Sequence, residues 1–389
     1  MLSPFLKQLL SLKTFAPQVY YTLVIWLACE LLAVFVLPLC FSDAVFLSLY
    51  MDDKAKISTE RFLRHENANI PDAVAGWSNT PNEKRGPWVT DKYGSRSVTP
   101  IVVDRNDKTR IIFLGSSMVN GGRGVANHET MSAYLESASI ETFNFASMSY
   151  SVDQSLLMYR SKIKAFSPDI LVVGIDPTPI AGLYNHYIPF KIPDETSMPY
   201  LKPRFSLSED KLVEIRPNQN WLMSYLEDRE FHQFLKKNDA YYRDFQQYKS
   251  FGFTPIAHGL FIVFKKFRSF FGYYLGEGAS DPLLEKIMET FMQEAEQQGT
   301  KVYFAMLPNQ RMFNWAGIWQ FFPDRYQLRV DALTLAGFST IDIRKALRES
   351  GYDESELFHE DELHYRRLAN EIIGEVIKVK LIEDGEIKP

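Results

Sequence analysis

Cysteine is nearly absent from this chain of 389 residues: Cys29 and Cys40 are the only two, and both lie within one apolar run. The rest of the chain therefore has no disulfide framework, which suits an extracytoplasmic location without establishing it. The sequence also lacks internal repeats and low-complexity tracts, and its formal net charge is only −5. Because no global basic field exists, nucleic acid is not expected as a partner.

Metal and cofactor motifs are missing as well. Residues 359–364 read His-Glu-Asp-Glu-Leu-His, which is rich in metal-ligating residue types. The segment lacks the His-Glu-x-x-His spacing of zinc proteases, so no metal and no cofactor is expected. The histidines outside this segment have no motif around them: His65, His128, His186, His232 and His258.

One long hydrophobic run occurs, over residues 19–41. A helix of this length spans about 34 Å, enough for a hydrocarbon core of about 30 Å. Lys7 and Lys13 precede the run, so the positive-inside rule predicts a cytoplasmic tail at 1–18 and a single-pass anchor in the inner (cytoplasmic) membrane. The main domain is then extracytoplasmic. A cleaved signal peptide is the alternative, although no Ala-x-Ala-type site follows the run.

Two segments each allow two interpretations of their contacts with the membrane. Glu30 is the one charged residue of the run, and it is either protonated or hydrogen-bonded to a neighbour, or it contacts a partner transmembrane helix. Residues 259–271 are aromatic and basic together but too short to span a bilayer. They fit an interfacial helix on anionic headgroups or a core helix with a solvated basic side.

Strand and helix patterns alternate from residue 108 to 385, which predicts a three-layer α/β/α sandwich with a parallel sheet. An insertion at about 181–278 interrupts the alternation, and residues 42–107 form a lead-in of short strands and turns that is expected to pack on the main domain. The expected strands are 111–114, 142–145, 170–175, 301–306 and 340–343, and the expected helices are 129–137, 154–166, 283–298 and 365–379. Within the insertion we expect a hairpin of 205–207 with 212–215 and helices at 221–237 and 241–248.

A serine and a histidine stand where catalysis would need them. Residues 111–117 read Ile-Ile-Phe-Leu-Gly-Ser-Ser, a buried strand that breaks into a sharp turn before a helix. Such a turn lifts a hydroxyl above the carboxyl edge of a parallel sheet. Asp361 and His364 lie three residues apart ahead of the last helix, and a serine nucleophile needs a base oriented by a carboxylate. Glu362 competes with Asp361 for the orienting role.

These blocks resemble the SGNH (GDSL-type) serine hydrolases and acyltransferases over residues 110–377. The resemblance makes Ser117 the nucleophile, because the Gly-Asp-Ser block of that family matches Gly115-Ser116-Ser117. The closing Asp-x-x-His matches Asp361 and His364. The Gly-Ser-Ser form is similar to the membrane-anchored subclass that includes the teichoic acid D-alanylation protein, and it implies an SGNH/flavodoxin-like fold.

The two middle blocks depart from the family pattern. Asn144 opens the second block, but Ser149 stands where a glycine is usual. The third block should supply an oxyanion-hole asparagine after strand 170–175, and the chain reads Asp-Pro-Thr-Pro there. Losing one such donor costs about 3–4 kcal/mol of transition-state stabilisation. The amides of Ser117 and Ser149 remain available, with the Thr178 or Asn120 side chain as a further donor.

The sequence therefore predicts an anchored serine esterase or O-acyltransferase whose substrate is an envelope glycan or lipid. The choice between water and a sugar hydroxyl as acyl acceptor stays open. One alternative is a non-catalytic binding or assembly protein that keeps the fold. In another alternative, the apolar helix itself carries the function, and the chain is a subunit that associates with a membrane acyltransferase partner.

Overall fold

A parallel sheet of five strands forms the centre of the molecule. Its strands are β5 (Thr109–Leu114), β6 (Ile140–Asn144), β7 (Ile170–Ile175), β10 (Lys301–Met306) and β11 (Thr340–Asp342). The order β11-β10-β7-β5-β6 is that of a flavodoxin-like doubly wound sheet, so the predicted fold class is confirmed. The computed structural model describes residues 4–41, 53–122, 124–176, 180–191, 198–224, 228–251, 281–314, 323–360 and 364–389, with isolated residues at 254, 256–257, 259–260 and 263.

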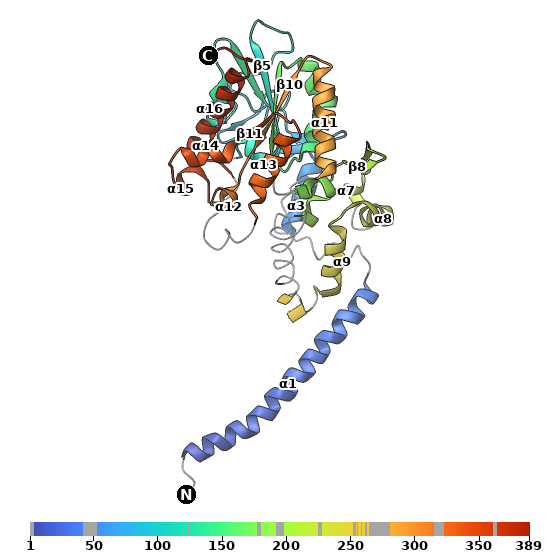
Figure 1. The fold of residues 1–389 in the computed structure, drawn as a ribbon. Coiled ribbons are helices and arrows are strands. Elements are labelled where there is room, and N and C mark those ends of the chain that lie inside the picture. Colours follow the sequence, from blue (N-terminus) through green and yellow to red (C-terminus); the bar gives the residue numbers. More distant parts are fainter. Residues whose placement is uncertain are drawn as a thin grey trace.

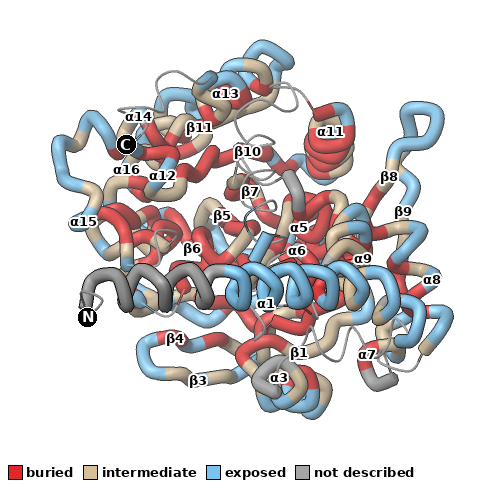
Figure 2. Tube along the Cα trace, turned by 90° about the horizontal axis from the view of Figure 1, so that it is seen from below, coloured by how far each residue is buried: buried red, intermediate tan, exposed pale blue. Residues whose placement is uncertain are grey.

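Helices cover both faces of this sheet (Figure 1). On β5, Ile112 and Leu114 belong to one core cluster, which they share with α5 (Val152–Ser161), α11 (Pro282–Glu296) and α13 (Arg325–Leu335). Ile111 and Phe113 point the other way, into a second cluster with α14 (Ile343–Glu349) and α16 (Arg367–Glu383). This alternation is the two-residue period of a strand, and both faces are apolar because both are covered. Figure 2 shows the strands buried between these layers.

Two expected helices are wrong: the one at 129–137, and the one at 221–237, where Asp228 is extended and caps a separate helix at 229–238. Residues 129–137 hold two short 3₁₀ turns, η1 (Asn127–Glu129) and η2 (Ala133–Leu135), where an α-helix was predicted. The Thr130 hydroxyl donates to the Asn127 carbonyl at 2.9 Å. Side chains of this kind offer the backbone an alternative to helical hydrogen bonds, which explains the difference.

The insertion begins with η4 (Ile180–Tyr184), α6 (Ile188–Lys191) and the predicted hairpin β8 (Arg204–Ser208) and β9 (Lys211–Ile215). It continues with α7 (Trp221–Ser224), α8 (Arg229–Asn238) and α9 (Tyr242–Phe251). Lys202 fastens it to the sheet domain, because its Nζ donates to Asp153 Oδ2 at 2.6 Å and to Ser151 Oγ at 2.9 Å at the start of α5. Most of the aromatic and basic stretch 259–271 lies outside the described residues.

The lead-in contains α3 (Asp53–Leu63) and two small antiparallel pairs. β1 (Asn69–Asp72) pairs with β2 (Gly76–Asn79), and β3 (Lys84–Arg85) pairs with β4 (Trp88–Val89). Trp77 Nε1 donates to the Met148 carbonyl at 2.8 Å, and Asn69 Nδ2 donates to Ser147 Oγ at 2.8 Å. The lead-in therefore packs on the loop after β6, as the sequence predicted.

The N-terminal helix α1 (Pro4–Cys40) projects from the rest of the molecule (Figure 1). Its apolar part, Pro17–Leu37, is long enough to cross a membrane, and it is mostly exposed (Figure 2). Glu30 is an exception at 7% exposure, and α1 contacts α9 of the insertion. The described residues of α1 thus form a hydrophobic rod with one buried carboxyl.

Candidate active site

The candidate nucleophile lies at the point where the sheet reverses its winding. Gly115 ends β5 with a φ of +140°, and a β-carbon there would lie 2.8 Å from the Gly174 carbonyl oxygen of β7. Only glycine fits this close approach. Ser116 then caps the four-residue helix α4 (Ser117–Asn120), with its Oγ accepting from the Met118 amide at 3.3 Å. Ser117 is thereby the first helical residue after β5, between β5 and β7, where doubly wound sheets place their ligands.

The Ser117 side chain is 8% exposed and makes no hydrogen bond within the described part of the chain. The Ser117 and Ser149 amides likewise donate to no acceptor among the described residues. Ser149 has a φ of +58°, a left-handed conformation that glycine adopts most readily. This backbone fits the position that the family pattern gives to glycine. Ser149 Oγ donates to Met198 Sδ at 3.3 Å, so the insertion lies beside this loop.

The imidazole of His364 lies against the loop that follows α4. A β-carbon on Gly122 would be 3.1 Å from Cδ2 of His364, and one on Gly124 would be 2.3 Å from Nε2 of His359. Gly122 comes five positions after Ser117, within about a turn and a half of helix. The fold therefore brings Ser117 and His364 to the same corner of the sheet although they lie 247 positions apart in the sequence. A hydrogen bond between them stays a prediction.

The segment carrying His364 is closed and pinned to the sheet. The His359 amide donates to the His364 carbonyl at 2.9 Å, and Phe358 pairs with Tyr365 across the segment. The buried Tyr365 hydroxyl donates to the Pro308 carbonyl at 2.6 Å, just past the carboxyl end of β10. The short helices α12 (Gln310–Phe313) and α15 (Glu354–Leu357) flank this corner. The position of His364 is thus set by β10.

Three of the predicted site residues, Asp361, Glu362 and Thr178, lie outside the described residues. The choice between the two carboxylates therefore stays a prediction. No group of three or more potential metal ligands occurs among the described residues.

Asn120 lies within the described residues, and its side chain is hydrogen-bonded to the surrounding structure. Its Nδ2 donates to the Ala146 carbonyl at 2.7 Å, while its Oδ1 accepts from Trp88 Nε1 at 3.1 Å. As an oxyanion donor it has only its second amide hydrogen left. Asn144 behaves similarly, since its Nδ2 donates to the Val119 carbonyl at 2.8 Å and its Oδ1 accepts from the Ala146 amide at 3.1 Å. The two asparagines tie α4 to the loop after β6.

Sequence reasoning missed the lead-in residues that brace this corner. Asn79 Nδ2 donates to the Ala146 carbonyl at 3.0 Å, next to the bond from Asn120. Arg96 is fully buried and donates to the loop after α4. Burial lowers the pKa of Arg96 to about 10, with Glu129 opposing the shift, so the group stays charged at neutral pH. Isolated asparagine and arginine residues in a turn-rich segment carry no periodic signal that could have identified them.

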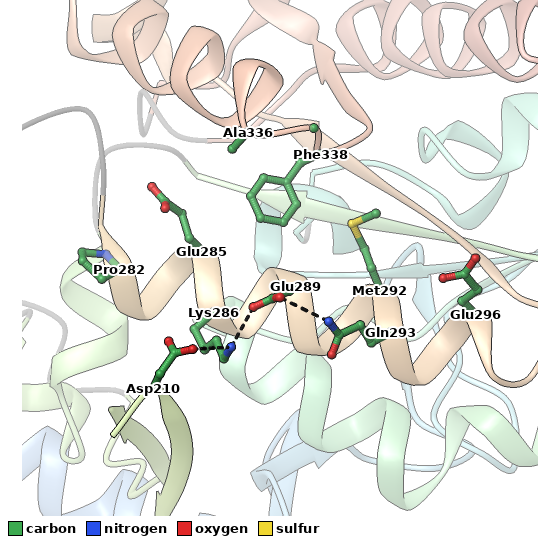
Figure 3. A pocket seen from close by; sticks show the side chains of 11 residues that line it. Asp210, Pro282, Glu285, Lys286, Glu289, Met292, Gln293, Glu296, Ala336 and Phe338 are labelled. Carbon is green, nitrogen blue, oxygen red and sulfur yellow. Dashed lines mark hydrogen bonds and ion pairs between the residues drawn. The ribbon is translucent and has the colours of Figure 1, made fainter. Parts of the chain in front are cut away.

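A pocket of about 530 Å³ lies elsewhere, along α11 (Figure 3). Its lining comes from α11, the tip of the β8–β9 hairpin and the turn before β11: Asp210, Pro282, Glu285, Lys286, Glu289, Met292, Gln293, Glu296, Ala336, Gly337 and Phe338. Lys286 donates to Asp210 at 3.2 Å and pairs with Glu289 at 2.9 Å across it. No predicted catalytic residue lines this pocket, so it is distinct from the Ser117 corner.

No family model matches the chain, and no curated protein matches it in sequence. In structure it is similar to LAE5, an α/β hydrolase enzyme from the metagenome of Lake Arreo, Spain, with 11% identity, a TM-score of 0.37, and coverage of 72% of this chain and 97% of the other. It is similar to a catalytic mutant of the acetylxylan esterase Axe2 from Geobacillus stearothermophilus, with 11% identity, a TM-score of 0.38, and coverage of 71% and 95%. A protein assigned to the G-D-S-L lipolytic family from Desulfitobacterium hafniense matches with 12% identity, a TM-score of 0.34, and coverage of 70% and 100%.

Proposed function

We propose that this chain is a membrane-anchored serine esterase or O-acyltransferase of the cell envelope. Ser117 is the nucleophile, His364 the general base and Asp361 the carboxylate that orients it. The observation that supports this best is the His364 ring against Gly122, on the loop directly after the Ser117 helix. This contact supports the assignment of Ser117 and His364 to one site.

In the proposed reaction the Ser117 hydroxyl attacks the carbonyl carbon of an ester, and His364 takes its proton. The alcohol of the ester leaves with that proton, and the acyl group stays on Ser117. Water or a sugar hydroxyl then attacks the acyl-serine, gives its proton to His364, and the acyl product leaves as Ser117 regains its hydrogen. The Ser117 and Ser149 amides hold the oxyanion in both steps, with Thr178 or Asn120 as a third donor.

The placement of the membrane helix favours an envelope substrate. α1 extends from the side of the molecule on which α12 lies, and α12 follows the carboxyl end of β10 (Figure 1). With α1 as an uncleaved anchor, Ser117 would face the membrane side, within reach of a lipid or a glycan attached to the membrane. This geometry suits the membrane-anchored subclass of the family.

An electrophilic serine probe on the full chain in detergent tests the proposal. Labelling should occur at Ser117 and disappear in Ser117→Ala, whereas the neighbouring Ser116→Ala, which removes only a helix cap, should retain it. His364→Ala should slow labelling by about 10²- to 10⁴-fold, because the hydroxyl loses its base. Asp361→Asn should slow labelling more than Glu362→Gln. Equal labelling of wild type and Ser117→Ala would refute the nucleophile assignment.

The absence of an asparagine after β7 favours a second candidate function. A site with fewer oxyanion donors fits a binding or assembly subunit that keeps the fold without turnover. In that case the folded full chain would not label at all. A membrane acyltransferase partner should then co-purify with it, and Glu30→Leu should weaken that association.

A further inference from the structure

A buried arginine of the lead-in holds the loop after α4 from behind. Arg96 Nη1 donates to the carbonyls of Asn120 and Gly122, the latter at 2.7 Å. Nη2 donates to the Val125 carbonyl, and Nε donates to Asn127 Oδ1 at 3.1 Å. The side chain is 0% exposed, so these acceptors replace the water that the guanidinium has lost.

The other side of the same loop carries the two imidazoles. Gly122 meets the ring of His364 and Gly124 meets the ring of His359, as the short distances from their would-be β-carbons show. Gly121 and Gly122 both have positive φ, +83° and +57°. The backbone at Gly122 therefore contacts both the Arg96 guanidinium, through its carbonyl, and the His364 ring.

Arginine suits this position for a physical reason. Its planar fork presents five N–H donors in fixed directions, which match several carbonyls at once. A lysine would supply a point charge with a flexible stem and would leave part of this set without donors. The Arg96 amide also donates to the Asn144 carbonyl at 2.7 Å, so its backbone is fixed to the end of β6.

We propose that Arg96 is a positioning residue for His364: by fixing the carbonyls of Asn120, Gly122 and Val125, it sets the backbone against which the imidazole lies. The inference rests on the proposed function, since it assigns Arg96 a part in the same site. Displacement of the loop displaces the ring, and a misplaced base slows proton transfer from the serine.

Arg110→Lys provides a matched control for Arg96→Lys. Arg110 is also 0% exposed, and it donates to the Val102 carbonyl at 3.0 Å and to the Phe166 carbonyl at 2.6 Å. It lies on β5 near the opposite, amino edge of the sheet. Both variants lose the N–H donors of a buried guanidinium. Only Arg96→Lys removes donors from the carbonyls of the loop after α4, which lies against His364.

The experiment combines serine-probe labelling with nuclear magnetic resonance of the full chain in detergent, carrying isotope-labelled histidine. His364→Gln assigns the ring signal of His364. We expect Arg96→Lys to shift that signal and to slow labelling by about 10- to 100-fold. Arg110→Lys should leave both unchanged although it also lowers thermal stability. If Arg96→Lys does not fold, Asn127→Ala, which removes one acceptor of Arg96, should shift the signal in the same direction by less.

The two proposals fail in different ways. A His364 signal that keeps its wild-type position in Arg96→Lys, or in Asn127→Ala where that variant stands in, overturns the positioning role. A similar shift in Arg110→Lys overturns it too, because the effect would then be general loosening. A shifted signal in a chain that never labels leaves the positioning intact and refutes only the catalytic function.

Discussion

Gly122 shows how much of the candidate site depends on single residues. Its φ of +57° lies in the left-handed region, and its missing side chain makes room for the His364 ring. Both properties are needed together, since a residue that tolerates the backbone angle would still crowd the imidazole. The sequence showed a glycine-rich stretch after Ser117, but the ring that occupies the space comes from 242 positions further on.

Gly122→Ala should therefore destabilise the chain and impair the site. The left-handed backbone costs alanine roughly 1–2 kcal/mol. Gly86→Ala is the control, because Gly86 has a φ of +60° and nothing within 4 Å of its would-be β-carbon. Both variants should lose stability in urea unfolding, Gly122→Ala by more because of the added contact with His364, and only Gly122→Ala should slow labelling of Ser117. Equal labelling rates would show that His364 does not depend on this contact.

His186 is a second residue whose surroundings decide its chemistry. Its Nδ1 lies 2.7 Å from the Lys202 carbonyl, and its Nε2 accepts from Arg204 Nε at 3.1 Å, which places the hydrogen on Nδ1. Burial, reinforced by the charges of Arg204 and Lys202, lowers the pKa of His186 to about 3. The ring is therefore neutral in the folded chain at any physiological pH.

The free energy of unfolding should accordingly fall as the pH falls below 6.5, the ordinary pKa of histidine. Below that pH the unfolded chain binds a proton that folded His186 refuses, so its contribution is present above pH 6.5 and lost down to about pH 3. The slope is up to about 1.4 kcal/mol per pH unit. Urea unfolding of wild type and His186→Gln at several pH values should show a shallower acid loss in the variant.

Asp239 acts in the opposite direction within the same network. Its Oδ2 accepts from the His186 and Tyr187 amides at 2.6 and 2.9 Å, yet burial raises its pKa from 3.8 to about 6. Folded Asp239 gains a proton before the unfolded chain does, so its stabilisation is full below pH 3.8 and lost as pH rises through 6. Between about pH 4 and 6 the two slopes offset each other. In Asp239→Asn the acid loss from His186 should therefore be steeper than in wild type.

Among the elements, the strands and long helices could be predicted, whereas the individual contacts of the lead-in could not. β7 is an unbroken apolar run and β5 ends in one, at residues 111–114, so the local sequence predicts their burial on both faces. Asn69, Asn79 and Arg96 form hydrogen bonds with residues between 24 and 78 positions away, and no local sequence pattern predicts these bonds. Ser117 and His364 were predicted from motif spacing, whereas the contacts of Arg96 and His364 with the loop after α4 could be seen only in the fold.

The insertion is held to α5 by one buried ion pair, Lys202 with Asp153, in which both side chains are 0% exposed. Burial lowers the pKa of Lys202, and the carboxylate opposes that shift. A buried pair of this kind adds little over an apolar pair, but breaking it leaves one charge without compensation. It therefore specifies where the segment containing Met198 lies.

Lys202→Met should cost about 3–5 kcal/mol of unfolding free energy, because Asp153 is left buried and charged. Adding Asp153→Leu should restore much of that loss. Lys286→Met is the control, because Lys286 pairs with the exposed Asp210 on the surface. Its removal should cause no measurable change in the free energy of unfolding. A double variant as unstable as Lys202→Met alone would show that the loss comes from packing.

At the scale of the whole molecule, the apolar part of α1 (Pro17–Leu37) separates two lysines near the start of the chain from the rest of the protein. Lys7 and Lys13 precede the apolar part, while Asp43, Asp52 and Asp53 follow it. A reporter enzyme fused after Pro389 should therefore be active only if it works outside the cytoplasm. Cytoplasmic activity of that fusion would refute the orientation. A smaller chain cleaved near residue 42 would remove the anchor and leave the orientation standing.

The bracing of the sheet by the lead-in has a consequence for how the chain folds. Residues 69–97 leave the ribosome before any strand of the five-stranded sheet. The hydrogen-bond partner of Asn69, Ser147, is synthesised 78 positions later, and the partner of Trp77 is Met148. Contacts between such distant residues require long loops to close, and the chain loses conformational entropy before the contacts stabilise it. This slows folding. We expect Trp77, which is buried in the folded chain, to stay exposed until β6 and the following Met148 are in place. In the proposed orientation, the lead-in crosses the membrane before these contacts form, with Trp77 uncovered.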